Sequence, residues 1–466
     1  MDKIIWRLTW TLTNFLAERG TNFGQLQAYV KQNNILDTDT EKDTKKVSDV
    51  FSHVNFADYH LYELTEQGAN SEVILSLFKR LTQNTPTNPV WASYQNHCVS
   101  CELAEKCPIK FNYEFVMEKQ VQEKLTHLLI KCIVQYKHLI SVRALLNFLH
   151  DLVVPLELAP LSTAEVYTKV KRYQVKTFIN NIHPNYLFEH PDLSAIYKHL
   201  HLLDPVNERK EDLDQTIIQL ITTDKVKDTF EREAGLPKEN SFFHRFLTEG
   251  FQDKTHKKSN YTLLINLFTR WHYFKTNQQN EVLGNQIYQK YLQSLYYFNS
   301  EATPESAPYQ QLYKDIKEAI YRWNGNAFQA DMVNVFIGHK QDTYKISQRL
   351  KLKPKVHPRD ISVPQKNLKK FKDIITLYYG VEGNPEESLE ISIDYELYQL
   401  LQKVIKGYRP NKLDKSNHIN FVHIVDKIIG LNSQNTPLIF HENNGKSKNG
   451  YRLSKDDFGK YQFEKI

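Results

Sequence analysis

The sequence predicts a mainly α-helical protein with a small α+β module at its C-terminal end. Apolar residues recur at three- and four-residue spacing through most of the 466 residues, as in helices with one buried face. Period-two alternation over residues 389–394 instead predicts a strand. Hydrophobic residues make up 41% of the chain and aromatic residues 12%, enough for the cores of two to four domains.

Helical patterns succeed one another through the first two thirds of the chain. Proline residues between positions 155 and 205 keep the helices there short, because proline lacks the backbone N–H and clashes inside a helix. The segment 301–308 is a predicted linker. The predicted helices cover residues 25–36, 72–81, 121–136, 142–153, 193–203, 213–221, 263–274, 287–298 and 309–323.

The predicted α+β module begins with the strand at 389–394, followed by a helix over 396–408. Three short strands are predicted at 437–440, 451–453 and 461–463, with a turn-rich stretch before the second. The sequence Asn443-Asn-Gly-Lys-Ser447 in that stretch is no phosphate loop, because the first glycine of G-x-x-x-x-G-K-[ST] is replaced by Phe440.

A basic stretch interrupts an otherwise balanced chain. Residues 340–373 hold eleven Lys or Arg against three acids, while the whole chain carries a net charge of +6. Such a local excess is typical of a surface that contacts a phosphate backbone, and a solvated linker face is the alternative. The predicted DNA-binding residues are Lys345, Arg349, Lys351, Lys353, Lys355, Lys369 and Lys370.

All four cysteines lie between residues 98 and 132, and three of them read C-x2-C-x5-C. Thiolates two residues apart on a turn can share one tetrahedral metal ion, so Cys98, Cys101 and Cys107 are predicted metal ligands. Structural zinc, an iron–sulfur cluster and plain reduced cysteines all fit this spacing. No Ser/His/Asp or Cys/His arrangement accompanies the cysteines, so a nucleophilic role ranks last.

The fourth metal ligand has two candidates. Cys132 completes the set of cysteines, although it lies on the apolar stripe of a predicted helix and would equally suit a core position. His97 is the second candidate, since two adjacent residues seldom ligate one ion without straining the turn.

A second feature is the helix predicted over 142–153. Ser141 can cap it, with Val142, Leu145, Leu146, Leu149 and Leu152 on the buried face and Arg143, Asn147 and His150 opposite. An arginine in the first turn opposes the helix dipole, so Arg143 either meets an anion supplied from elsewhere or forms a surface ion pair. Asp204, with Arg209 and Asp214, is a polar patch more typical of a cap and an ion pair than of chemistry.

Several of these segments, taken in order, carry a family resemblance. They are residues 12–16, residues 55–62, the cysteine cluster, residues 140–151, and Leu203-Asp-Pro205 with Arg209 and Asp214. From about residue 11 onward the chain resembles the F component (DptF) of bacterial DNA phosphorothioation-dependent restriction systems. The resemblance implies a P-loop ATPase family using ATP and Mg²⁺, which works with G and H components to restrict DNA lacking the sulfur-modified backbone.

The chain departs from that family at its beginning. The family's phosphate loop lies upstream of residue 12, where this chain has only eleven residues, so we expect a product that lacks its Walker A motif and does not hydrolyse ATP alone. The resemblance places Arg143 where AAA+-like ATPases carry a phosphate-sensing arginine. The alternative function is a metal-stabilised helical DNA-binding or scaffolding protein without nucleotide chemistry.

These inferences give the expected domain organisation. The expected parts are a remnant of an ATPase core (1–90), a cysteine-rich metal-binding insertion (91–117), a helical lid (118–155), a helical domain (156–335), and the basic stretch with the α+β module (336–466). No run of 18 apolar residues and no secretory signal are present, and clustered cysteines suit a reducing compartment, so we expect a cytoplasmic protein without membrane contact.

Overall fold

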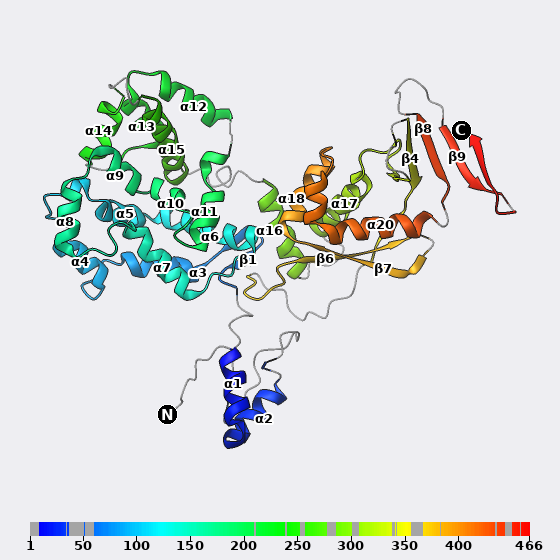
Figure 1. Cartoon of the computed structure of the whole chain (residues 1–466), viewed down its shortest axis with the longest axis horizontal. Coiled ribbons are helices and arrows are strands. Elements are labelled where there is room, and N and C mark those ends of the chain that lie inside the picture. Colours follow the sequence, from blue (N-terminus) through cyan, green and yellow to red (C-terminus); the bar gives the residue numbers. More distant parts are fainter. Residues whose placement is uncertain are drawn as a thin grey trace. The chain divides into compact units, whose positions relative to one another are not determined.

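The chain divides into two compact units, Met1–His60 and Leu61–Ile466. In the first unit, a turn of 3-10 helix joins α1 (Thr9–Arg19) to α2 (Gly24–Gln32). The computed structural model (Figure 1) describes residues 9–33, 35–36, 51, 60–208, 211–237, 240–251, 257–276, 286–300, 307–337, 341, 343–355, 367–382, 384–433, 436–442, 450–456 and 458–466. The predicted linker at 301–308 lies almost entirely outside these residues.

Helices make up the first part of the second unit. Most of their buried apolar residues, between Ile74 and Phe274, form one contiguous cluster, which we call the first core. The helices are α3 (Glu72–Thr82), α4 (Pro89–His97), α5 (Pro108–Met117), α6 (Lys119–Tyr136), α7 (Val142–Val153), α8 (Thr163–Lys171), α9 (Val175–Asn181), α10 (Asn185–Glu189), α11 (Ala195–Leu202), α12 (Glu211–Thr222), α13 (Val226–Ala234), α14 (Ser241–Glu249) and α15 (Lys257–Lys275).

Helix α7 shows how a cap and one buried face define these helices. The Ser141 hydroxyl accepts a hydrogen bond from the Ala144 N–H at 3.2 Å, which confirms the predicted N-cap. The predicted buried face is partly wrong, because Val142 and Leu146 are exposed. Phe148 is buried in their place, and burying this larger ring turns the helix so that Leu146 faces outward.

The second core lies between helices and a three-stranded antiparallel sheet. Strands β5 (Leu352–Lys355), β6 (Ile375–Val381) and β7 (Asn384–Ile393) form the sheet in that order. The helices are α16 (Gln286–Asn299), α17 (Ala307–Arg322), α18 (Tyr395–Ile405), α19 (Lys412–Asn417) and α20 (Ile419–Ser433). Buried apolar residues from Tyr288 to Ile428 fill it, with Trp323 against Phe421 at 4.8 Å between ring centroids.

Two further antiparallel sheets complete the fold. The five-stranded sheet has the order β10 (Tyr461–Lys465), β9 (Gly450–Lys455), β8 (Leu438–Glu442), β4 (Tyr344–Arg349) and β3 (Met332–Asn334). The three C-terminal strands confirm those predicted at 437–440, 451–453 and 461–463, whereas β7 and α18, predicted in the same module, belong to the second core. A hairpin of β1 (Glu63–Thr65) and β2 (Gly68–Asn70) was not predicted; Gly68, the residue directly after its turn, has a φ of +134°, which favours glycine.

Residues from early in the chain contribute to both cores. On α6, Leu128 and Leu129 belong to the first core, whereas Ile130 belongs to the second together with Tyr62 and Leu64. The boundaries expected at 90, 117 and 155 all fall within the stretch that builds the first core. Residues 61–90, expected in an ATPase-core remnant, form the β1–β2 hairpin, α3 and the start of α4.

All strand pairs among the described residues are antiparallel. No helix in the described ranges combines the length and apolar character needed to cross a membrane.

Candidate metal centre

The cysteines of the C-x2-C-x5-C motif lie on the connection between α4 and α5. Cys98 is the C-terminal cap of α4, and Cys107 is the N-terminal cap of α5. Pro108 occupies the first helical position of α5, and a residue before proline is driven into extended backbone, as Cys107 is with φ −86° and ψ 113°. The proline therefore fixes the direction from which the Cys107 side chain leaves the helix start.

Side-chain hydrogen bonds fix the connection between α4 and α5. The Glu114 carboxylate on α5 accepts hydrogen bonds from the Tyr94 hydroxyl and from the Lys110 ammonium, each at 2.6 Å, and so ties α4 to α5. In the middle of the connection, the Asn240 side-chain amide donates to the Glu105 carbonyl oxygen at 2.9 Å. The loop that carries the three cysteines is thus fixed to α5 and α14.

The three sulfur atoms lie close enough to influence one another's ionisation. Burial raises the pKa of the Cys98 thiol to about 11, and the neighbouring Cys107 and Cys101 add to that rise. Burial also raises the pKa of Cys107, while the backbone N–H groups of Lys110 and Ile109 act in the opposite sense. Burial therefore favours the thiol form of Cys98 and Cys107 at neutral pH.

Backbone donors point at two of these sulfurs. The Leu103 N–H donates to the Cys101 sulfur at 3.4 Å, and the first turn of α5 presents N–H groups to the Cys107 sulfur. Hydrogen bonds of this kind stabilise thiolates, the form that binds metals. Cys101 and Cys107 also pack against a small apolar cluster that includes Leu158 and Val170, which limits access of water.

The structure does not bring the two candidate fourth ligands into this cluster. Cys132 is buried in the first core on α6, where burial raises its pKa well above the usual range and Lys131 opposes that rise. His97 is exposed at the last position of α4. Among the described residues, no three His, Cys, Asp or Glu side chains are already arranged around one metal position, so ligation would require the loop to tighten.

The basic residues predicted to bind DNA lie on or beside β4 and β5, which belong to different sheets, and directly after Leu368, which pairs with Leu64 of β1. Lys351 and Lys353 are exposed and share Glu382, at 2.9 Å and 3.4 Å from its carboxylate oxygens. The Lys351 ammonium lowers the pKa of Glu382. Arg349 lies 3.4 Å from the Asp331 carboxylate. Carboxylates thus neutralise part of this surface.

The remaining predicted DNA-binding residues differ in their surroundings. Lys369 is exposed and pairs with Glu63 at 3.2 Å, and Lys355 donates to a backbone carbonyl of β7 at 3.0 Å. Lys345 and Lys370 are exposed. Since β5 is an edge strand, its lysines also protect that edge against pairing with another chain, which is a purely structural reason for their presence.

Arg143 occupies the first turn of α7 and is exposed, as are Asn147 and His150 on the same helix. The N-terminal turn of a helix attracts anions, so the exposed guanidinium of Arg143 and the positive end of the helix dipole lie in the same turn. Along the sequence, α5 and α6 separate Arg143 from the cysteine motif.

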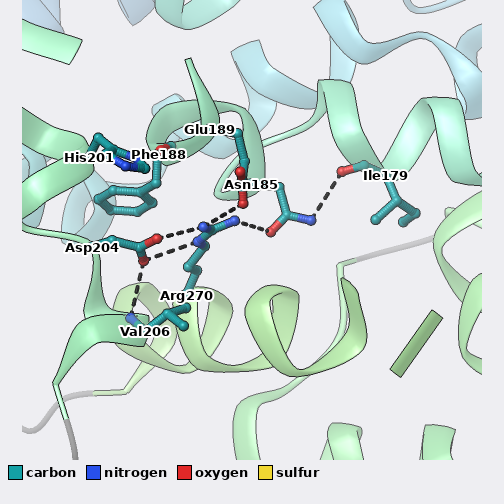
Figure 2. Close-up of polar contacts among 8 residues, drawn as sticks. All are labelled: Ile179, Asn185, Phe188, Glu189, His201, Asp204, Val206 and Arg270. Carbon is teal, nitrogen blue, oxygen red and sulfur yellow. Dashed lines mark hydrogen bonds and ion pairs between the residues drawn. The ribbon is translucent and has the colours of Figure 1, made fainter. Parts of the chain in front are cut away.

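The polar patch at Asp204 is a buried network centred on Arg270 of α15 (Figure 2). The Arg270 guanidinium donates to Asp204 at 2.5 and 3.1 Å and to the Asn185 side chain at 3.1 Å, and it pairs with Glu189 at 2.7 Å. Asp204 also accepts from the Val206 N–H at 3.1 Å. The expected cap and ion pair are confirmed for Asp204, although its partner is Arg270; Arg209 lies outside the described residues.

Comparison of the chain with protein-family models, with curated proteins and with solved structures gave no match. Inferences about function therefore depend on the sites described above and on the resemblance in the motif order.

Proposed function

We propose that this chain is a component of a DNA phosphorothioation-dependent restriction complex that acts against unmodified DNA. Its partners are duplex DNA and the G and H components of that complex. The observation that carries the proposal is the cysteine cluster, which lies in the expected order between the other matching segments and gathers three sulfurs on one loop.

A bound metal ion would stabilise the helical part of the chain at this cluster. Cys98, Cys101 and Cys107 would hold zinc or an iron–sulfur cluster, and the N–H groups directed at Cys101 and Cys107 would offset the charge of the thiolates. Burial, with a smaller contribution from Cys107 and Cys101, raises the pKa of the Cys98 thiol, so a metal ion that binds the thiolate would release its proton.

Metal analysis tests this part of the proposal. We expect about one zinc ion or one iron–sulfur cluster per chain, and loss of the metal in Cys107→Ala with a lower thermal midpoint, because structural metal binding contributes to folding. An absorbance spectrum separates the two metals, since iron–sulfur clusters absorb visible light. Cys132→Ala is the control, because Cys132 lies in the first core.

The Cys132→Ala variant is expected to keep its metal although the small cavity lowers its stability. Equal loss of metal in both variants would show that Cys132 is the fourth ligand after all. Unchanged metal content in Cys107→Ala, or no metal in the unaltered chain, would contradict the metal site.

For DNA contact, the proposal relies on the exposed cations around β4 and β5. Lys345 and Lys370 are exposed. Lys351 and Lys353 share the single carboxylate of Glu382, so these three side chains together keep a net positive charge. Each cation that neutralises a phosphate releases condensed counterions, which makes such binding steeply salt-dependent.

Replacing Glu382 provides a gain-of-function test. Glu382→Gln releases Lys351 and Lys353 from their ion pairs, so we expect duplex DNA to bind roughly threefold more tightly, with a steeper dependence on salt. Lys351→Glu with Lys353→Glu should weaken binding at least about tenfold and reduce the slope of log K against log salt by about 0.9 for each lost phosphate contact. Fluorescence anisotropy at several salt concentrations measures both quantities.

A matched control removes a carboxylate elsewhere. Glu123→Gln releases the exposed Lys119 of α6, 3.6 Å away, and is expected to leave DNA affinity unchanged. If the Glu382 and lysine variants also leave affinity and salt dependence unchanged, the DNA contact is wrong. The alternative, a metal-stabilised helical scaffolding protein without nucleotide chemistry, would then be favoured. The ion pairs that four of the predicted DNA-binding residues form with carboxylates support this alternative.

Under the proposal, Arg143 would act in the ATPase activity of the family. The intact family protein would bind ATP and Mg²⁺ through its upstream phosphate loop, and the exposed Arg143 at the start of α7 would face a phosphate group. Residues 118–155 would then act as the helical lid, with residues 1–90 as the end of the ATPase core.

A further inference from the structure

Strand β10 is an edge strand whose side chains are exposed along its whole length. Tyr461 is 70% exposed and Phe463 is 63% exposed, although both point to the face of the sheet that carries Phe440 and Leu453. Phe463 lies against Phe440 with ring centroids 5.4 Å apart. Among the described residues, no strand pairs with the outer edge of β10, so this end of the sheet presents apolar side chains beside unpaired backbone groups.

The backbone pattern defines which groups are available for a further strand. The Ile466 N–H donates to the Gly450 carbonyl oxygen, and the Lys460 carbonyl oxygen accepts from Asp456, so even-numbered residues of this segment direct their backbone groups toward β9. Hydrogen-bonding direction alternates along an antiparallel strand. The N–H and C=O groups of Tyr461, Phe463 and Lys465 therefore point outward.

The sequence of β10, Tyr461-Gln-Phe-Glu-Lys465, is complementary to itself when read in the opposite direction. In an antiparallel pair centred on Phe463, the two Phe463 side chains are opposite each other, and Tyr461 faces Lys465 of a second copy. Gln462 then faces Glu464 of that copy. These are an aromatic pair, a cation–π pair and a hydrogen-bonding pair, each favourable across neighbouring strands.

Other two-fold registers are less favourable. Centring the pair on Glu464 places two carboxylates directly opposite each other, and centring it on Gln462 leaves Lys465 without a partner within β10. Only the register centred on Phe463 pairs every residue of the strand, and it uses the outward-pointing backbone groups of Tyr461, Phe463 and Lys465.

We propose that β10 pairs with β10 of a second copy of this chain, antiparallel and centred on Phe463, so that the two five-stranded sheets become one continuous sheet. The interface is isologous, as closed two-fold dimers require. Strand pairing of this length buries less surface than a permanent dimer needs, so the dimer is weak and forms with rising protein concentration. This inference is independent of the proposed metal site and DNA contact.

Sedimentation velocity of the whole chain over a roughly hundredfold range of concentration tests the dimer. We expect a monomer–dimer equilibrium. Gln462→Lys faces Glu464 of the second copy and should tighten the dimer roughly threefold to tenfold, whereas Gln462→Glu should weaken it by a similar factor. The opposite signs are specific to the Phe463 register.

Phe463→Pro provides a second, independent variant. Proline removes an N–H that points away from β9, so the β9–β10 ladder is retained while pairing with a second copy is blocked. We expect a monomer at all concentrations and a circular dichroism spectrum like that of the unaltered chain. A chain that is monomeric throughout would overturn the proposal, as would a dimer that none of the three variants alters; the latter result would place the dimer contact elsewhere.

Discussion

Replacing Arg270 with methionine is expected to lower the free energy of unfolding by about 3–5 kcal/mol, because it leaves a buried carboxylate without its cation. Asp204 is 5% exposed and receives two hydrogen bonds from the guanidinium. Asn185 also loses the donor for its side-chain oxygen. Methionine preserves most of the apolar stem, so the loss reports the charged contacts more than packing.

Urea denaturation of single and double variants separates these effects. Adding Asp204→Asn to Arg270→Met should recover part of the stability, because asparagine carries no charge and can still accept from the Val206 N–H. Arg245→Met is the control, since Arg245 is exposed and pairs with Glu249 along one helix at 3.1 Å; it should change stability by less than about 0.5 kcal/mol. Equal effects at Arg270 and Arg245 would refute the structural role of the network.

Lowering the pH is expected to reduce the free energy of unfolding by about 3 kcal/mol through His183 alone. Burial lowers the pKa of His183 to about 4, from an ordinary value near 6.5. The unfolded chain therefore takes up a proton at a higher pH than the folded chain does. This contribution to stability is complete above pH 6.5 and is lost as the pH falls from about 6.5 to about 4.

The surroundings of His183 explain this shift. Its Nε2 atom lies 2.5 Å from the Leu152 carbonyl oxygen, so Nε2 carries the proton of the neutral ring. Nδ1 is buried and has no hydrogen-bond partner among the described residues, so a second proton would find no acceptor there.

Thermal midpoints measured between pH 7 and pH 4 test the prediction. His183→Gln retains a donor for Leu152 but does not titrate, so its midpoint should fall less steeply with acidification than that of the unaltered chain. His150→Gln is the control, because His150 is exposed on α7 and its replacement should leave the steep fall in place. A His183→Gln profile that parallels the unaltered one would show that other groups cause the acid sensitivity.

Much of the fold is readable from the sequence where one periodicity dominates. The helix predicted over 142–153 matches α7 at both ends, since Ser141 supplies a cap and the apolar spacing is regular. Helix α20 was missed although Phe421, Val425 and Ile428 recur at helical spacing and form its buried face. Strand β6 was also missed, although Ile375, Leu377 and Tyr379 alternate as a strand should.

The sites were predictable only where their residues are close in sequence. The spacing of Cys98, Cys101 and Cys107 indicated a shared loop, and the structure has one. The pairing of Asp204 with Arg270 joins residues 66 positions apart and depends on how α15 packs against the 3-10 turn η4 (Pro205–Asn207), which no local pattern specifies. An arginine beside the apolar residues Phe268 and Trp271 was nevertheless a usable sign of a buried charge.

The second core contains residues from α6 and from the β1–β2 hairpin, which matters for folding during synthesis on the ribosome. The first core is built from residues 74–274, so it can close before α16 has left the exit tunnel. Tyr62, Leu64 and Ile130 are buried together with residues of the later helices, so their burial is completed only when those helices have been synthesised. Until α16 and the later elements emerge, the nascent chain exposes these three apolar side chains, and an exposed apolar surface favours aggregation.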